Sequence, residues 1–565
     1  MTEEVIRTTM SICPECMVQI PAEFYVDPKN NYVMLRKTCE EHGEFKDKIS
    51  IDADEYKWQM NFTDEIGSTV NITTKPCDVS SGIKPTKKGC PNDCGICENH
   101  KSAPCICLID LTNRCNLTCP ICFANASAAG YVVEPTYDEV VQIMEHFRSM
   151  KPFPAVLLQF AGGEPTLRKD LPEIIRKGKE LGFAETMLST NGVRIAKSVE
   201  YLRSLIEAGL DTIYLQFDAT NAPEVWKKVR GVNLWPIKKK VIENCEEVGG
   251  ITVMLVPVIA KGINDNQVGP IMDFAKEHNK VIGGVVFQPV SLCGRISFEE
   301  LMDLRYTTSD LKVDLNKATN NAITKFYPLA SSAKFTKLLA WFDNMPPWAA
   351  VSHHDCGFAT IAVVNDKDEW EPLENYVDAV GVVKWANKCW DMVQDKEIPK
   401  PTSLLKGINL ADYGSVASTL GKFIDDMTSL GYRNMMKAYF MAGMLKYIKF
   451  TKALSSKTFQ SLIKLVATPN LNTAGNFFLT KNMLISAMHF QDAYNFDLNR
   501  VSQCLVHYGV IDPDDHSKVL EMPFCAFNTI HRPIIEKKLA LKDEQAEKPE
   551  VIQSKIESYI ETMEK

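Results

Sequence analysis

The stretch CICLIDLTNRCNLTCPICFAN, residues 105–125, decides the fold of this chain. It opens with an apolar run, residues 105–111, which predicts a buried strand. A polar loop follows in which Cys115, Cys119 and Cys122 have the spacing C-x3-C-x2-C, and Phe123 comes directly after the last of them. Three thiolates this close in sequence can face one point, and soft thiolate sulfur selects iron–sulfur clusters or zinc. The loop therefore predicts a metal site.

Three cysteines are one ligand short of a [4Fe–4S] cluster, so one iron is free to hold another molecule. The spacing resembles that of the radical S-adenosylmethionine (SAM) superfamily. This resemblance implies that Cys115, Cys119 and Cys122 are the catalytic residues and that the open iron chelates the amino and carboxylate groups of SAM. It also implies that SAM is cleaved reductively to methionine and a 5′-deoxyadenosyl radical. The alternative is a small zinc knuckle.

The composition is typical of a folded protein inside the cell. With 565 residues the chain is too long for one core, which predicts two to four domains. The net charge of −8 gives no reason to expect nucleic acid as a partner. The first ten residues are polar and no run of about 18 apolar residues occurs, so we expect a cytoplasmic protein. Its 18 cysteines then indicate metal ligation rather than disulfides.

Strand-like and helix-like segments alternate from residue 105 to about residue 290. This alternation predicts a parallel sheet curled into a partial (β/α)6 barrel, with ligands held where the strands end. We therefore predict an α/β fold with an N-terminal metal module of rubredoxin or zinc-ribbon type and a mostly helical C-terminal region. The predicted barrel strands are residues 105–111, 155–161, 184–190, 211–218, 251–259 and 282–290.

Polar motifs follow several of these strands. The GGEP sequence at 162–165 is similar to a motif of the radical SAM superfamily, and glycines there let backbone approach a ligand. The Glu164 carboxylate or a backbone carbonyl is suited to receive the ammonium group of SAM. Ordinary turns are the alternative, because Gly, Asn and Asp are common in turns. The predicted cofactor-binding residues are Phe123, Gly162, Gly163, Glu164, Pro165, Ser189, Asn191, Gln216 and Asp218.

Cys90, Cys94 and Cys97 repeat the C-x3-C-x2-C spacing before the barrel begins. We predict an auxiliary [4Fe–4S] cluster there. Its fourth ligand stays open among Cys77, Cys105, Cys107 and a distant cysteine. The alternative is a second zinc knuckle, completed by His100.

Cys13, Cys16, Cys39 and His42 form a C-x-x-C and C-x-x-H pair at the N-terminus. Two such knuckles on hairpins make a tetrahedral site for one metal ion. Zinc is the default ion, and iron of the rubredoxin type is the competitor.

We predict a third cluster held by four cysteines from the second half of the chain, and four unrelated buried thiols are the alternative. The proposed ligands of the third cluster are Cys293, Cys356, Cys504 and Cys525.

Residues 385–480 are rich in long apolar side chains and lysine. A helix of this composition fits a membrane surface, where lysines meet anionic head groups. The alternative is a helix that packs its apolar side on the rest of the protein. The last 25 residues, which are highly charged, read as a solvated helix or a frayed tail.

A closer resemblance rests on the order of the motifs: the N-terminal C-x-x-C and C-x-x-H-G pair, KGCPNDCGICENHKS, TNRCNLTCPICFANAS, GGEPTLR, MHFQDAYNFDLNRVSQC and PFCAFN. This order is similar to that of archaeal tetraether lipid synthases and of the related radical SAM proteins described as pterin methylases. The resemblance implies a rubredoxin-like iron, one SAM-binding cluster and two auxiliary clusters. It also implies that hydrogen is abstracted from terminal methyl carbons of isoprenoid lipid tails, and that two chains are joined by a carbon–carbon bond.

The expected partners are an isoprenoid lipid substrate, an electron donor such as a ferredoxin or flavodoxin, and the inner face of the cell membrane. Two other functions stay open. A radical SAM C-methyltransferase acting on a pterin predicts a compact polar pocket, and a non-catalytic iron–sulfur redox protein predicts reduction without 5′-deoxyadenosine. The expected segments are a metal module (1–60), an auxiliary iron–sulfur segment (61–104), the barrel (105–295), its extension (296–384), the lipid- or membrane-facing region (385–480), a C-terminal cluster segment (481–540) and a charged tail (541–565).

Overall fold

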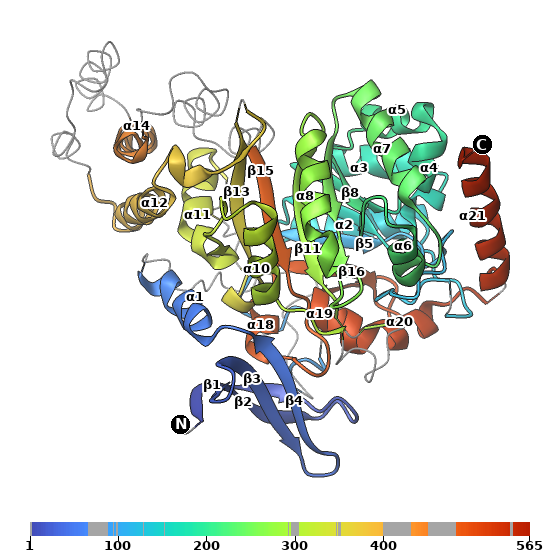
Figure 1. Cartoon of the computed structure of the whole chain (residues 1–565), viewed down its shortest axis with the longest axis horizontal. Coiled ribbons are helices and arrows are strands. Elements are labelled where there is room, and N and C mark those ends of the chain that lie inside the picture. Colours follow the sequence, from blue (N-terminus) through green and yellow to red (C-terminus); the bar gives the residue numbers. More distant parts are fainter. Residues whose placement is uncertain are drawn as a thin grey trace.

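The fold is taken from a computed structural model of the chain. The structure describes residues 3–65, 89–93, 95–97, 100–127, 129–151, 153–291, 293–294, 304–345, 347, 352–365, 367–398, 431–449, 482–542 and 546–564. Cys77 and Cys94 lie outside these residues, as does most of the predicted lipid-facing region. Two sheets organise the described part, a small one near the N-terminus and a large one in the main body (Figure 1).

The small sheet is antiparallel and is made by the first strands of the chain. Its order is β1-β2-β3-β4, and helix α1 (Ala53–Glu65) follows it. Phe24 and Leu35 of this sheet pack against Tyr56 of α1 in a core of their own. The turns after β1 and β3 lie at one end of the sheet and carry the four predicted N-terminal ligands. The strands are β1 (Glu4–Ile12), β2 (Gln19–Asp27), β3 (Tyr32–Cys39) and β4 (Gly43–Ser50).

The large sheet contains the predicted barrel. Neighbouring strands from β5 to β11 pair in parallel, in the order β5-β6-β7-β8-β9-β11. This confirms the predicted α/β class with its parallel sheet and N-terminal module. The strands are β5 (Ile106–Asp110), β6 (Leu157–Ala161), β7 (Glu185–Thr190), β8 (Thr212–Gln216), β9 (Thr252–Val256), β10 (Val258–Ile259) and β11 (Ile282–Pro289).

Strands from the C-terminal part of the chain extend this sheet at both sides. β15 (Asn482–Met488) pairs in parallel with β11, and β16 (Val506–Ile511) pairs in parallel with β5. The sequence predicts neither pairing, because both strands are short and lie far along the chain from their partners. Antiparallel strands complete the two edges: β12 (Tyr327–Pro328), β13 (Gly357–Val364), β14 (Trp370–Pro372) and β17 (Val519–Pro523).

Helices pack on the outer face of the parallel strands. Alternate residues of β5, such as Cys107 and Ile109, point to this side and share one core with Val140 and Ile143 of α2. The opposite side chains of each strand therefore face the interior of the barrel. The helices are α2 (Tyr137–Ser149), α3 (Leu171–Glu180), α4 (Val193–Lys197), α5 (Val199–Glu207), α6 (Pro223–Arg230), α7 (Trp235–Val248), α8 (Val268–Glu277) and α10 (Thr308–Ala318).

A second helical core holds the described part of the predicted lipid-facing region. Helix α14 (Tyr432–Met444) packs on α11 (Ala333–Phe342) and α12 (Ala379–Gln394). The Tyr439 ring lies 5.1 Å from the Trp385 ring, and Phe440 lies 5.7 Å from Phe342. The apolar side of α14 is thus buried inside the protein, as the alternative of internal packing predicts. No helix among the described residues is long and apolar enough to cross a membrane.

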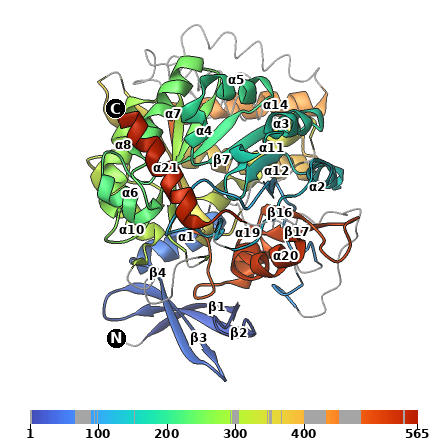
Figure 2. The same cartoon turned by 90° about the vertical axis from the view of Figure 1, so that its right-hand side faces the viewer.

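The last part of the chain folds back onto the barrel. It contains α18 (Leu498–Ser502), α19 (Phe524–Ala526), α20 (Arg532–Leu539) and α21 (Pro549–Glu564). Helix α21 lies along the barrel helices in Figure 2, and Ile552, Ile556 and Ile560 are buried there. The predicted helix is therefore present, but it is not solvated on all sides, because isoleucines spaced four residues apart form an apolar stripe that packs on α7.

Candidate active site and metal centres

The cysteine loop begins directly after β5, at the edge where the parallel strands end. Cys115, Cys119 and Cys122 are each half-buried there. Burial raises the pKa of Cys115 well above its ordinary value, and the proximity of Cys119, Glu164 and Cys122 raises it further. The structure therefore brings the three thiols together, while their role as cluster ligands stays a prediction.

Gly162 and Gly163 allow the end of β6 to lie against this loop. The Gly163 amide donates to the Thr112 carbonyl at 2.7 Å, and the Glu164 amide donates to the Arg114 carbonyl at 2.8 Å. A Cβ atom at Gly162 would lie 2.3 Å from the Thr112 oxygen, and one at Gly163 would lie 2.2 Å from the Arg114 oxygen. The two glycines are thus required for the contact between this turn and the cysteine loop.

The Glu164 side chain is fully buried and its carboxylate accepts hydrogen bonds from within the protein. Its Oε1 accepts from the Thr166 hydroxyl at 2.5 Å and from the Thr190 hydroxyl at 2.7 Å, and its Oε2 accepts from the Asn191 amide at 2.8 Å. This carboxylate joins the ends of β6 and β7. The binding of the SAM ammonium by this carboxylate or by a backbone carbonyl of the turn stays a prediction. Pro165 begins the short helix η1 (Pro165–Leu167) and is buried.

Residues at the end of β7 contact both β6 and the cysteine loop. The Asn191 side-chain amide donates to the side-chain Oδ1 of Asn116 at 2.7 Å, next to Cys115. Ser189 accepts a hydrogen bond from Gln159 of β6 at 2.7 Å. Asn191 therefore positions the loop, and Ser189 lies on the inner face of the barrel.

Asp218 and Arg230 form a buried ion pair behind the loop. Arg230 reaches both carboxylate oxygens of Asp218, at 2.6 and 2.8 Å, and donates to the Ile121 carbonyl at 3.0 Å. Gln216 donates to Asp218 and accepts a hydrogen bond from Lys238 at 3.2 Å. Burial lowers the pKa of Lys238 to about 7. Sequence reasoning missed Arg230 and Lys238, because basic residues are common on helices such as α6 and α7 and nothing local distinguishes these two.

Replacing Arg230 by lysine should loosen the cysteine loop without removing the charge opposite Asp218. Lysine cannot reach Asp218 and the Ile121 carbonyl together, since it lacks the fork of the guanidinium. We expect 5′-deoxyadenosine formation to fall about 10–100-fold, as misplaced reacting groups cause. Anaerobic rate measurements and iron content per chain check this. Lys227→Met is the control, because Lys227 on the same helix is exposed; equal losses in both variants would contradict the role of Arg230.

The residues of this site fit the implied cluster and SAM. The three thiols would supply the soft ligands of an iron–sulfur cluster and would leave one position for the chelating groups of SAM. Arg230 lies near Cys119 and lowers its pKa, although burial dominates and raises it. A nearby guanidinium is suited to a site of negatively charged thiolates.

The N-terminal centre has the geometry of a tetrahedral metal site. The ligand atoms of Cys13, Cys16, Cys39 and His42 all lie within 4.8 Å of one another. His42 Nδ1 is 3.5 Å from Cys39 Sγ and 3.7 Å from Cys13 Sγ, and the Cys16 and Cys39 sulfurs are 3.9 Å apart. Bonds of about 2.0–2.3 Å to a central zinc give similar separations.

Removal of one thiol from this centre should empty it and unfold the small sheet. Because a metal held by these four residues would join the turns after β1 and β3, Cys39→Ser is expected to lose one equivalent of bound metal and to expose this sheet to proteases. Elemental analysis with limited proteolysis measures both effects. Cys245→Ser in the barrel core is the control. An unchanged metal content in Cys39→Ser would contradict the ligand assignment.

The four cysteines predicted to hold a third cluster come close together. Burial raises the pKa of Cys504, Cys525 and Cys293, and neighbouring thiols raise it further: Cys525 and Cys356 act on Cys504, Cys356 acts on Cys525, and Cys525 acts on Cys293. A Cβ atom at Gly294 would lie 2.1 Å from the Cys122 carbonyl oxygen, which places this group beside the SAM-cluster loop. Their ligand role stays a prediction.

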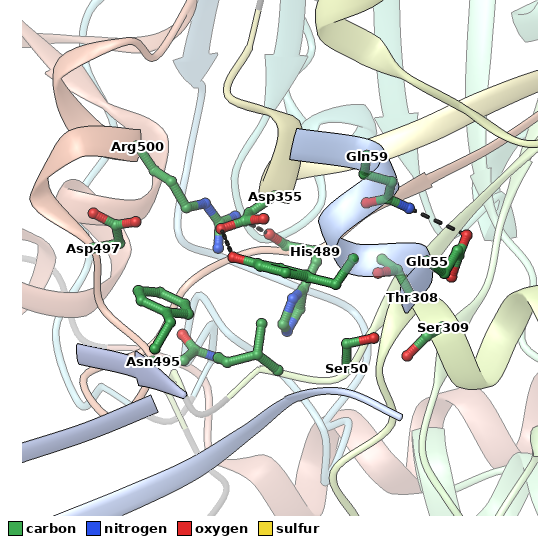
Figure 3. Close-up of a pocket in the computed structure, with 13 residues that line it drawn as sticks. Ser50, Glu55, Gln59, Thr308, Ser309, Asp355, His489, Asn495, Asp497 and Arg500 are labelled. Carbon is green, nitrogen blue, oxygen red and sulfur yellow. Dashed lines mark hydrogen bonds between the residues drawn. The ribbon is translucent and has the colours of Figure 1, made fainter. Parts of the chain in front are cut away.

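A polar pocket adjoins Cys356, between the N-terminal sheet, α10 and the C-terminal segment. Its volume is about 470 Å³, including its open mouth, and Figure 3 shows Asp355, His489 and Arg500 among its walls. His353, His354 and Asp355 bring three ligand atoms within 4.8 Å. Arg7 pairs with Asp355 at 2.5 Å, however, and this positive charge disfavours a cation there.

The predicted auxiliary segment docks on the C-terminal segment. Cys90 and Cys97 are close enough for Cys97 to raise the pKa of Cys90 after burial, and Cys94 lies outside the described residues. Cys107 belongs to the main core, and Cys105 is buried beside it. His100 contacts the Cys504 carbonyl at 3.2 Å. The fourth ligand of this centre stays open.

Comparison with known proteins agrees with this architecture. Residues 109–275 match the radical SAM superfamily, and residues 5–51 match the HMPTM N-terminal zinc ribbon domain. The 7,8-dihydro-6-hydroxymethylpterin dimethyltransferase of Methanocaldococcus jannaschii is 37% identical over 95% of this chain and 96% of its own length. The chain belongs to the radical SAM superfamily and to the family of this protein.

More distant relatives share the barrel region. A probable GTP 3′,8-cyclase of Methanococcus maripaludis is 33% identical over 32% of this chain and 58% of its own length. The crystal structure of Streptococcus suis SuiB bound to S-adenosylmethionine overlaps 39% of this chain and 48% of its own, with 19% identity and a TM-score of 0.31. This overlap is too low to support a conclusion.

The prediction of lipid-chain coupling is wrong. The full-length relative is a pterin dimethyltransferase, and its match spans nearly the whole of both chains. The motif order on which the lipid prediction rested is shared by both kinds of protein, so it could not separate them. This radical SAM enzyme therefore uses SAM and a [4Fe–4S] cluster and needs an electron donor, and its zinc ribbon is consistent with an additional metal.

Proposed function

We propose that this radical SAM enzyme is a C-methyltransferase that acts on 7,8-dihydro-6-hydroxymethylpterin or a closely related pterin. The observation that carries the proposal is the 37% identity to the dimethyltransferase of Methanocaldococcus jannaschii, which extends over the metal module, the barrel and the C-terminal segment. The match therefore includes the segments outside the barrel as well as the barrel itself.

The inner face of the barrel supports a small polar substrate. Asp110, Gln159, Ser189 and Gln216 occupy strand positions opposite to the apolar side chains that pack under the helices. A wall of amide, hydroxyl and carboxylate groups suits a heterocycle with many donors and acceptors.

The cluster and SAM, when bound, supply the 5′-deoxyadenosyl radical that removes hydrogen from carbon. The chain's own residues position this chemistry. Asn191 and Arg230 hold the cysteine loop, while the Gly162-Gly163 turn holds it from the β6 side. Strands β15 and β16 widen the sheet beyond β11 and β5, and a site that excludes water protects a reactive species from side reactions.

The test is anaerobic turnover of the reconstituted full-length enzyme with SAM, a strong reductant and 7,8-dihydro-6-hydroxymethylpterin. Mass spectrometry should find 5′-deoxyadenosine and a pterin that has gained one or two methyl groups in place of hydrogen. SAM with a deuterated methyl group identifies the methyl source. Unchanged pterin beside formed 5′-deoxyadenosine would refute the substrate, and no 5′-deoxyadenosine under any condition would favour the redox-protein alternative.

A further inference from the structure

A small polar pocket lies between the cysteine loop, the Gly162-Gly163 turn and helix α20. Its volume is about 250 Å³, including its open mouth. The pocket is therefore a small recess that can contact only the edge of a ligand. Its polar lining comes from Asp110, Thr112, Asn113, Gly163, Arg532 and Glu536.

Asp110 belongs to the inner face of the barrel. It is the last residue of β5, where Cys107 and Ile109 point outward to the helices and Leu108 packs with Tyr508 on the other side. Strand alternation places Asp110 on the side of Leu108. The cysteine loop begins two residues later, with Thr112.

Arg532 is held rigidly on the opposite wall. Its Nε donates to Asn528 at 2.9 Å, and its Nη1 donates to Asp110 Oδ2 at 2.5 Å and to Glu536 at 2.9 Å. The guanidinium also lies 4.6 Å from the centre of the Phe527 ring. Such a side chain cannot move to find new partners without breaking several contacts.

Each member of this pair keeps one buried polar atom without a hydrogen-bond partner among the described residues: Asp110 Oδ1 and Arg532 Nη2. Arg532 is only 4% exposed. Buried polar groups are nearly always paired in folded proteins, and an unpaired group calls for an explanation. Asp110 Oδ1 is an acceptor and Arg532 Nη2 is a donor, and both belong to residues that line one pocket. A ligand that carries one donor and one acceptor would pair with both atoms.

We propose that this pocket binds the 2-amino-4-oxopyrimidine edge of the pterin substrate, and in this it rests on the proposed function. Asp110 Oδ1 accepts a hydrogen bond from the 2-amino group, and Arg532 Nη2 donates one to a ring carbonyl. The pocket is lined by two carboxylates, those of Asp110 and Glu536, and by one guanidinium, that of Arg532. The excess of negative charge favours a neutral ring rich in hydrogen-bond donors and disfavours a phosphate. The amino and carboxylate groups of SAM are the competing occupant.

The test compares two ligands on the wild-type enzyme and on Asp110→Asn. The ligands are 7,8-dihydro-6-hydroxymethylpterin and its 2-oxo analogue, in which the amino group is replaced by an acceptor. Dissociation constants come from anaerobic equilibrium dialysis with the full-length reconstituted protein, and SAM is measured in the same way. Asp314→Asn is the matched control: Asp314 lies on α10, accepts a hydrogen bond from Tyr306 and has a similar exposure.

The wild type should bind the 2-amino ligand about 10–100-fold more tightly than the 2-oxo ligand. The reason is that the 2-oxo group cannot donate a hydrogen bond to the charged carboxylate of Asp110. In Asp110→Asn the amide oxygen keeps the contact with Arg532 and the amide nitrogen faces the pocket as a donor. This variant should lose or reverse the preference, while Asp314→Asn keeps it. Arg532→Lys should weaken both ligands equally, since both carry the 4-oxo group.

Three results would overturn the assignment. An Asp110→Asn variant with the wild-type preference would remove the pterin from this pocket and leave the proposed function standing. A weakened affinity for SAM with unchanged affinity for both pterins would give the pocket to SAM. A wild-type protein that binds neither pterin would refute the proposed function together with this site.

Discussion

Replacing Cys119 by alanine is expected to lower 5′-deoxyadenosine formation by at least about 10³-fold, the scale on which enzymes lose activity when a residue of the reacting constellation is removed. Cys119 lies beside Cys122 and Arg230, and its removal would leave the cluster with two of its three predicted ligands. Iron should fall by about four atoms per chain, the content of one [4Fe–4S] cluster. Anaerobic nucleoside analysis and iron determination measure the two effects.

The control for this prediction is Cys245→Ala. Cys245 is a fully buried thiol of α7, away from the strand ends, and its replacement removes a sulfur without touching the loop. This variant should keep both iron content and 5′-deoxyadenosine formation. Turnover at the wild-type rate in Cys119→Ala would defeat the assignment of Cys115, Cys119 and Cys122 as the catalytic site.

Replacing Arg305 by methionine should destabilise the protein by about 3–5 kcal/mol, as expected when one partner of a buried charge group is removed. Arg305 is 2% exposed and lies 2.6 Å from Asp47 of the small sheet and 2.8 Å from Asp492 of the C-terminal segment. Burial already raises the pKa of Asp47, and Arg305 lowers it. Without Arg305 the carboxyls need protons to stay buried, so the loss should be smaller at low pH and larger at neutral pH.

Chemical denaturation of the anaerobic holoprotein at two pH values checks this prediction. Lys334→Met is the control, because Lys334 pairs with the exposed Asp391 and such surface pairs are worth about 0–1 kcal/mol. Combining Arg305→Met with Asp47→Asn and Asp492→Asn should recover most of the lost stability. Equal effects of Arg305→Met and Lys334→Met would show that the buried group does not join the small sheet to the C-terminal segment.

Local patterns predicted the barrel well. The six predicted strands coincide with β5–β11 because apolar runs and turn residues alternate at the spacing of a β/α repeat. The C-terminal strands β15 and β16 escaped prediction, since pairing with β11 and β5 depends on contacts between residues hundreds of positions apart. The apolar side of α14 was equally suited to a membrane or to α12, and only the packed neighbours distinguish the two.

By itself the sequence determined the chemistry that this protein can carry. Thiols at C-x3-C-x2-C spacing and a glycine pair after the next strand are local features, and local features are set by the chain's covalent geometry. The tertiary structure decided how each residue is used: Glu164 turns inward to join β6 and β7, Arg230 holds the loop, and Arg532 meets Asp110 across 422 positions. These roles depend on hydrogen bonds between segments that are distant in the sequence. The spacing of residues along the chain does not predict such bonds.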